Sequence, residues 1–138
     1  MNPQSKQDES RPAATLLVVD DEPQNVALLV EVFEHGGYKA LAAGSGPEAL
    51  EVARAQKPDA ILLDLMMPGM DGFEVLRRLR ADAVIRHIPV MVITAKYLEE
   101  PEQKFLSLNA QHIFMKGAFL VEDLLKGVER VLARGAAS

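Results

Sequence analysis

Residues 15–21 read TLLVVDD, an apolar run that ends abruptly in two carboxylates. A strand that is apolar on both of its faces is typical of a parallel sheet covered by helices on both sides. Four more short runs of this kind follow in the chain, at 38–42, 60–63, 90–93 and 112–115. Together with the run at 15–19, they predict five buried strands.

The segments between these runs have apolar residues at helical spacing, beginning with Val26, Leu29, Val30 and Phe33. Helix starts are indicated by Pro23, Pro47 and Pro101 in first turns and by Asp71 as an N-cap. Gly36-Gly37 would end the first helix with a left-handed residue. Strands that alternate with helices predict an α/β fold with three layers, in which a doubly wound parallel sheet lies between helices.

The composition excludes several classes of protein. The 138 residues are 49% hydrophobic and 25% charged, as in a single globular domain. The absence of cysteine excludes a disulfide framework, a thiolate metal site and a thiol nucleophile. The formal net charge of −5 argues against direct binding to nucleic acid, because such proteins usually present a basic face.

The ends of the chain differ from its middle. Residues 1–14 are polar and contain no apolar run, so we expect a disordered N-terminal tail and no signal peptide. No apolar run is long enough to span a bilayer. We expect one domain at 15–134, a short C-terminal tail at 135–138, and a cytoplasmic protein without membrane insertion.

Polar residues follow four of the predicted strands. Asp20 and Asp21 follow the first strand, Asp64 the third, Thr94 the fourth and Lys116 the fifth. The carboxyl ends of parallel strands meet at one rim, where α/β proteins bind ligands. Each residue alone has a structural explanation, since aspartate often caps helices and lysine is often a surface charge. Their occurrence together predicts a site, and three carboxylates at one rim favour a hard cation such as Mg²⁺.

The same residues suit the transfer of a phosphoryl group to a carboxylate. Asp64 would attack the phosphorus and form an acyl phosphate. Mg²⁺ would bridge carboxylates and phosphoryl oxygens, while Lys116 and the Thr94 hydroxyl would contact the other oxygens. A carboxylate is already ionised at neutral pH, so this chemistry needs no general base.

Four elements of the sequence resemble the receiver domain of two-component response regulators. They occur in the family's order and at similar separations, and they are LLVVDDE (16–22), ILLDLMMPGMDG (61–72), Thr94-Ala95 and Lys116. The resemblance covers about residues 15–134. It implies a flavodoxin-like sheet of five parallel strands in the order 2-1-3-4-5.

The resemblance also implies a role for each residue at the rim. Asp64 would be the phosphoacceptor, and it would bind Mg²⁺ with Asp21 and the backbone carbonyl of Met66, while Asp20 acts through water. Thr94 would be the switch hydroxyl and Lys116 the phosphoryl contact.

The resemblance further implies the partners of the protein. A histidine kinase or a histidine phosphotransfer protein would donate the phosphoryl group. A downstream protein would then bind around strand 112–115 and the helices on either side of it. Such a protein is a phosphoacceptor in signalling, not an enzyme with an external substrate.

Three positions depart from the family pattern. Ile113 replaces the usual switch aromatic. Gly117 replaces a proline that follows the lysine through a cis peptide, and a cis bond without proline costs about 2.5–4 kcal/mol. Asn109 replaces a loop glycine, which is tolerable because asparagine enters the left-handed region more readily than most residues.

Three functions follow from these observations. The leading one is a stand-alone receiver, since only residues 135–138 follow the last predicted helix. The second is a pseudo-receiver adaptor that binds partners without phosphorylation, locked in one state by Ile113 and Gly117. The third is a small phosphatase with an aspartyl nucleophile, which Met66 disfavours because it stands where such enzymes keep their acid/base aspartate.

Overall fold

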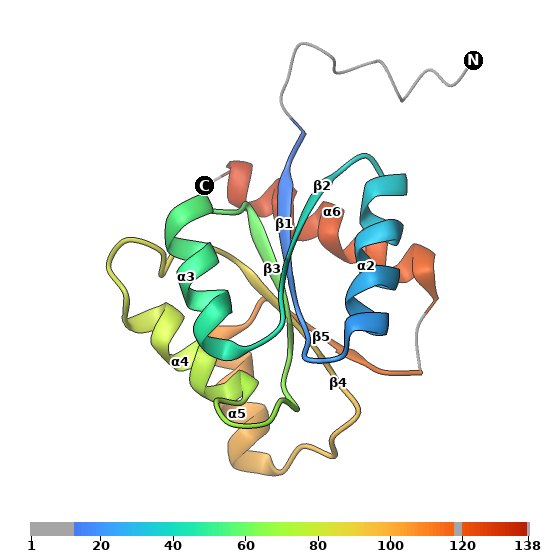
Figure 1. Ribbon diagram of the computed structural model, residues 1–138. Helices are drawn as coiled ribbons and strands as arrows, with labels where there is room; N and C mark the ends of the chain where they lie inside the picture. Colours follow the sequence, from blue (N-terminus) through green and yellow to red (C-terminus); the bar gives the residue numbers. More distant parts are fainter. Residues whose placement is uncertain (1–12, 118–119, 138) are drawn as a thin grey trace, which may run out of the picture.

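Five strands alternate with five helices along the residues that the computed structural model describes, 13–117 and 120–137 (Figure 1). The elements are β1 (Thr15–Val19), α2 (Pro23–His35), β2 (Lys39–Ala43), α3 (Gly46–Gln56), β3 (Ala60–Asp64), α4 (Gly72–Ala81), β4 (Val90–Thr94), α5 (Glu100–Asn109), β5 (His112–Met115) and α6 (Val121–Ala137). Residues 1–12 of the expected N-terminal tail lie outside the described part. No helix within the described part is long and apolar enough to cross a membrane.

The five strands form one parallel sheet in the order β2-β1-β3-β4-β5, which confirms the predicted fold. The observed limits of three strands differ by one residue from those expected. β2 begins at Lys39 because the Tyr38 N–H turns back to the Phe33 carbonyl at 3.0 Å. β3 and β4 continue through Asp64 and Thr94, so these polar residues belong to the strands themselves.

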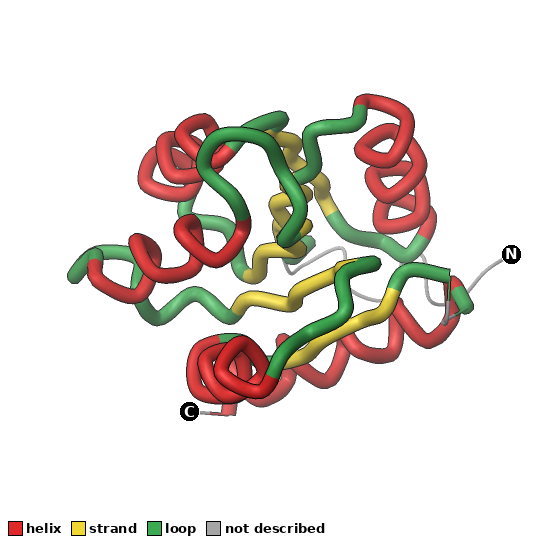
Figure 2. Tube along the Cα trace, turned by 90° about the horizontal axis from the view of Figure 1, so that it is seen from below, coloured by secondary structure: helices red, strands yellow, loops and turns green. Residues whose placement is uncertain are grey.

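The sheet has a hydrophobic core on each face, as its apolar runs predicted. Leu17 and Val19 of β1 pack on the side of α3, α4 and α5, whereas Leu16 and Val18 pack on the side of α2 and α6. Figure 2 shows the strands between helices on both sides. All four residues are at most 1% exposed, so the sheet is a rigid support for whatever its strand ends carry.

The predicted helix signals are present in the structure. Proline occupies the first turn of α2, α3 and α5, and the Asp71 side chain accepts the Glu74 N–H at 3.0 Å to cap α4. Gly37 has a φ of 95° just after α2. At the other end of the chain, α6 continues to Ala137, beyond residue 134, where the alanines favour helix.

Asn109 does not use the left-handed region that would make it a substitute for glycine. It is the last residue of α5, and Lys57 is the only residue other than glycine with a positive φ in the described part. The Asn109 side chain donates to the Phe105 carbonyl at 2.8 Å. Its own carbonyl accepts two hydrogen bonds from Arg80, at 2.9 and 2.7 Å, which hold the end of the helix in place.

Arg80 joins several segments at the amino ends of β4 and β5. Besides its two bonds to Asn109, it donates through Nη1 to the carbonyls of Arg86 and Ile88, at 2.9 and 2.8 Å. Its Nη2 also reaches Oε1 of Gln111 at 3.2 Å. Every N–H group of this guanidinium therefore has an acceptor, and each acceptor is a neutral oxygen.

Candidate functional site

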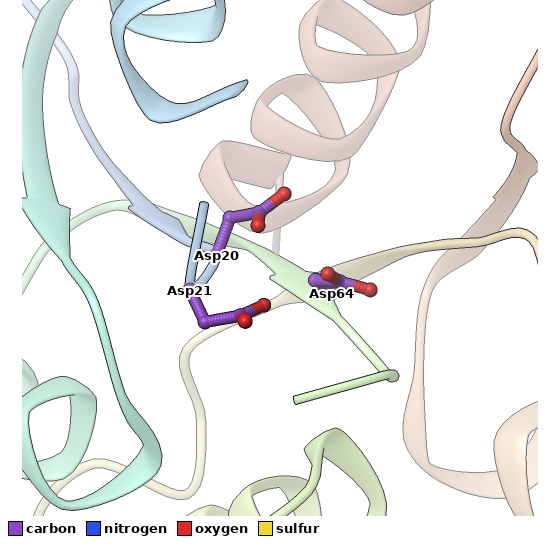
Figure 3. Close-up of side chains that lie close together, drawn as sticks. All are labelled: Asp20, Asp21 and Asp64. Atoms are coloured by element: carbon purple, nitrogen blue, oxygen red, sulfur yellow. The ribbon is translucent and has the colours of Figure 1, made fainter. Parts of the chain in front are cut away.

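Three aspartates meet at the carboxyl ends of the two central strands. Val19 pairs with Leu63, so Asp20 follows β1 beside Asp64 at the end of β3. One carboxylate oxygen each from Asp20, Asp21 and Asp64 lies within 4.8 Å of the others, and Figure 3 shows the three side chains around a common space. Asp20 and Asp64 are only 1% and 2% exposed. The predicted acidic cluster is therefore present, and two of its members are buried.

One ammonium group faces the two buried carboxylates. Lys116 Nζ lies 3.4 Å from Oδ2 of Asp64 and 3.8 Å from Oδ2 of Asp20. The other oxygen of Asp64 accepts the N–H of Met66 at 3.0 Å. Two of the three carboxylates thus share a single ammonium group, and all the ligand atoms that the cluster offers are carboxylate oxygens. This donor set fits a hard divalent cation such as Mg²⁺.

The surroundings of Asp64 disfavour its charge. Burial raises the pKa of the Asp64 carboxyl above its usual value, and the negative charge of Asp20 raises it further. The Met66 N–H and the Lys116 ammonium act in the opposite direction but do not cancel the effect of burial. A cation at the cluster would relieve this unfavourable burial of charge.

Thr94 lies next to this cluster at the end of β4. Ile93 pairs with Asp64 across the sheet, and Thr94 is the next residue along the strand. Its side chain is completely buried, and its hydroxyl oxygen accepts the Lys96 N–H at 2.9 Å. Its carbonyl accepts the Lys116 N–H at 2.8 Å, which positions the lysine beside it. The structure thus brings together all the side chains that the sequence predicted for the site.

The backbone around the cluster requires glycine at two positions, 117 and 72. Gly117 has a φ of 80°, which suits glycine, and no peptide bond in the described part is cis. The Lys116–Gly117 bond is therefore trans. A Cβ atom on Gly72 would lie 2.6 Å from the carbonyl oxygen of Asp64. The start of α4 consequently packs directly against the backbone that carries Asp64.

The structure shows the positions of Ile113, which departs from the family pattern, and of Lys96, which follows Thr94 by two residues. Ile113 is half-buried and packs against the core on the side of α3, α4 and α5, while Phe114 is buried on the opposite face. Lys96 is directed to Glu102, whose carboxylate lies 3.1 Å from its ammonium group. Ile113 thus fills space in the core next to α5 as an aliphatic residue.

The structure also places Asn25 beside the cluster, which the sequence did not lead us to expect. Its amide Nδ2 is 3.4 Å from Oδ2 of Asp20 and 2.9 Å from Oε1 of Glu22. In the sequence, little distinguishes Asn25 from the other polar residues of this helix. Its position one turn after two adjacent aspartates was the only available signal.

The chain is similar to known proteins along most of its length. The family model described as "Response regulator receiver domain" matches residues 16–129. Protein PilH of Pseudomonas aeruginosa is 34% identical over 120 residues, which are 87% of this chain and 98% of PilH. Response regulator PleD of Caulobacter vibrioides is 52% identical over 83 residues, but these are 60% of this chain and only 18% of PleD.

Solved structures of the same type superpose on most of the chain. The N-terminal domain of a response regulator receiver protein from Methanoculleus marisnigri is 41% identical, with a TM-score of 0.72 and coverage of 89% of this chain and 99% of that domain. Chemotaxis protein CheY4 of Vibrio cholerae is 30% identical, with a TM-score of 0.78 and coverage of 87% and 99%. The chain belongs to the family of response regulator receiver domains, the phosphorelay modules of two-component systems.

Proposed function

We propose that this protein accepts a phosphoryl group on Asp64, in a reaction that depends on Mg²⁺, and signals to another protein by a change of conformation. The donor would be a histidine kinase or a histidine phosphotransfer protein, and the reaction would take place in the cytoplasm. The observation that supports this most is the pair of buried carboxylates, Asp20 and Asp64, that share the single ammonium of Lys116. Such an excess of buried charge is costly unless the site binds a cation.

The two oxygens of Asp64 would have different tasks. Oδ1 accepts the Met66 N–H, which fixes the orientation of the carboxylate. Oδ2, which faces Lys116, would attack the phosphorus of the donor phosphohistidine. The new O–P bond would form as the P–N bond breaks, and the electron pair of that bond would stay on the donor imidazole. Lys116 would then stabilise the charge on a phosphoryl oxygen.

The metal would be held by residues that already converge. Asp21 and Asp64 would bind Mg²⁺ directly together with the Met66 backbone carbonyl, and Asp20 would act through a bound water. When bound, the ion would neutralise negative charge on the phosphoryl group. The support for this ligand set is the spacing of the three carboxylates and the partial exposure of the site on the side of Asp21.

The signal would start at Thr94. In the structure its hydroxyl oxygen accepts the Lys96 N–H, so the hydroxyl hydrogen remains free to be donated to a phosphoryl oxygen. New contacts to Thr94 and Lys116 would favour one of two arrangements of the following segments. The surface formed by α5, β5 and α6 follows Thr94 in the chain, and the downstream protein would bind to it. The receiver would comprise the chain from residue 15 to the end of α6.

Phosphorylation can be tested directly on the purified protein. Incubation with acetyl phosphate and Mg²⁺ should increase the mass of the intact protein by one phosphoryl group, and EDTA should prevent this. Asp64→Asn should remain unlabelled. Asp59→Asn is the matched control, because Asp59 is an exposed carboxylate at the opposite end of the sheet. Equal labelling of wild type and Asp64→Asn would refute the proposal.

An adaptor that binds partners without phosphorylation is the second candidate. The presence of Ile113 in place of an aromatic switch residue favours it, because this aliphatic side chain packs against the core and carries no aromatic ring to couple with Thr94. Backbone NMR spectra with and without beryllofluoride and Mg²⁺ distinguish the two functions. Shifts around Thr94 and Lys116 support the phosphorylated switch, whereas unchanged spectra support the adaptor.

A further inference from the structure

Asn25 connects the first turn of α2 to the acidic cluster. Its half-buried amide has two N–H bonds and two carboxylate neighbours, Oδ2 of Asp20 at 3.4 Å and Oε1 of Glu22 at 2.9 Å. The shorter bond to Glu22 fixes the amide group. The second N–H can then be directed at Asp20.

Asp20 is held through both of its oxygens by neutral donors. Oδ1 accepts the backbone N–H of Glu22 at 2.9 Å, and Oδ2 has the amide of Asn25 as its neutral partner. Oδ2 is also 3.8 Å from the ammonium of Lys116, farther than Asp64 is from the same group. Asn25 therefore competes with Lys116 for this one oxygen.

The other neighbours of Asn25 offer no replacement for it. A cavity of about 180 Å³ adjoins Asp20, Asn25 and Lys116, and aliphatic side chains from α2, α6 and β4 form most of its wall. If the amide were removed, the only side-chain donor from this wall left to Oδ2 of Asp20 would be Lys116. The carboxylate would then turn toward the lysine, and this closer ion pair would compete with a bound cation for Asp20.

We infer that Asn25 is a positioning residue that holds the Asp20 carboxylate against closer pairing with Lys116 and thereby sets the affinity of the acidic cluster for Mg²⁺. This inference rests on the proposed function, because it assumes that the cluster binds the ion. Asn25 itself need not contact the metal. Hydrogen bonds that orient a metal-binding carboxylate typically change metal affinity by about 10- to 100-fold when they are removed.

The first test measures Mg²⁺ binding by isothermal titration calorimetry and by NMR titration of the unphosphorylated protein. Asn25→Leu keeps the branched shape of the side chain and removes its donor, and we expect the dissociation constant to rise about tenfold. Gln24→Leu is the matched control, since Gln24 is exposed in the same helical turn and should leave the constant unchanged. If Asn25→Leu does not fold, Asn25→Ala serves the same purpose.

A second test asks whether Asn25 acts through Asp20. In an Asp20→Ala background, Asn25→Leu should cause no further loss of Mg²⁺ affinity, because the carboxylate that it orients is absent. A merely structural role for Asn25 would give the same loss in both backgrounds.

The outcomes separate this inference from the proposed function. If the wild type binds Mg²⁺ and Asn25→Leu binds it equally well, the inference fails while the proposed function stands. If the tenfold loss persists in Asp20→Ala, the positioning role is refuted. If the wild type binds no Mg²⁺ at all, both the inference and the metal dependence of the proposed function are wrong.

Discussion

The two ends of the sheet hold charged groups that are partly or fully buried, and the protein compensates these charges in different ways. At the amino ends of β4 and β5, the guanidinium of Arg80 gives each of its N–H groups to a neutral oxygen. At the carboxyl ends of β1 and β3, Asp20 and Asp64 share one ammonium at 3.8 and 3.4 Å. The guanidinium of Arg80 has all of its hydrogen-bond partners within the protein. The two aspartates, in contrast, keep an excess of negative charge that an external cation can neutralise.

This difference separates a structural charge from a functional one. Burial lowers the pKa of Arg80, so its charge has a cost, but fixed carbonyl dipoles at the end of α5 offset it. Burial likewise raises the pKa of Asp64, but here the nearest positive group is one ammonium that Asp64 shares with Asp20. In the absence of a cation, the buried carboxylates therefore destabilise the folded protein, and a bound cation would remove this cost.

The largest expected effect is at the amino ends of the strands. Arg80→Leu leaves the carbonyls of Asn109 and Ile88 without their donor, and we expect the free energy of unfolding to fall by about 3 kcal/mol. Urea denaturation measures this. Arg78→Leu is the control, since it removes only an exposed ion pair with Glu74 and should cost about 0.5 kcal/mol or less.

Arg80→Lys sharpens this result. It keeps the positive charge but loses the planar fork that reaches several carbonyls at once. Its stability should lie between those of the wild type and Arg80→Leu. If Arg80→Leu were as stable as Arg78→Leu, the contrast between the two ends of the sheet would be wrong.

The next effect is an increase in the free energy of unfolding, and we expect it at the carboxyl ends of β1 and β3. Asp64→Asn keeps an oxygen for the Met66 N–H and removes the buried charge, so in buffer without Mg²⁺ it should raise the free energy of unfolding by about 1 kcal/mol. Thermal unfolding followed by circular dichroism can measure this change. Asp59→Asn provides the comparison, because that exposed carboxylate accepts the Thr15 N–H and its loss should not stabilise the protein. A destabilised Asp64→Asn would mean that the cluster is already compensated.

The smallest effect concerns the exposed carboxylate that follows α4. The Arg54 side chain, with the Val84 N–H, lowers the pKa of Asp82 below its usual value. A carboxylate with a lowered pKa contributes stability above its unfolded-state pKa of about 3.9, and this contribution disappears as the pH falls through the lower folded value. Asp82→Asn should therefore lower the stability slightly and by a constant amount near pH 7, and flatten the stability curve below about pH 4, where the wild type loses this contribution. Urea denaturation across this range provides the measurement, and an unchanged acid slope would show that Asp82 gains nothing from Arg54.

The acidic cluster could be predicted from the sequence because of a simple geometric rule. Asp20, Asp64, Thr94 and Lys116 interrupt apolar runs at their carboxyl ends, and parallel strands bring those ends to one rim. The order of strands needed the family resemblance, since apolar runs alone do not say which strands are neighbours. The orientation of each carboxylate needed the structure.

The role of Arg80 could not be predicted in this way. It belongs to the segment RRLR at 77–80, where its neighbours Arg77 and Arg78 look equivalent to it in the sequence. Its partners are mostly backbone carbonyls, which every residue has, so no pattern of side chains marks them. The position of Asn109 was misjudged for the same reason, because the helix end it occupies is held by that arginine.

The close packing of Gly72 beneath the acidic cluster has a consequence for how variation in such proteins is interpreted. A Cβ at this position would lie 2.6 Å from both the Asp64 carbonyl oxygen and the Leu65 Cα, and no side-chain rotation can relieve contacts with backbone. Every substitution at Gly72 must therefore displace the end of β3, which carries Asp64, or the start of α4. A mutational scan that scores only signalling would therefore report position 72 as part of the catalytic chemistry, although glycine is required there for steric reasons alone.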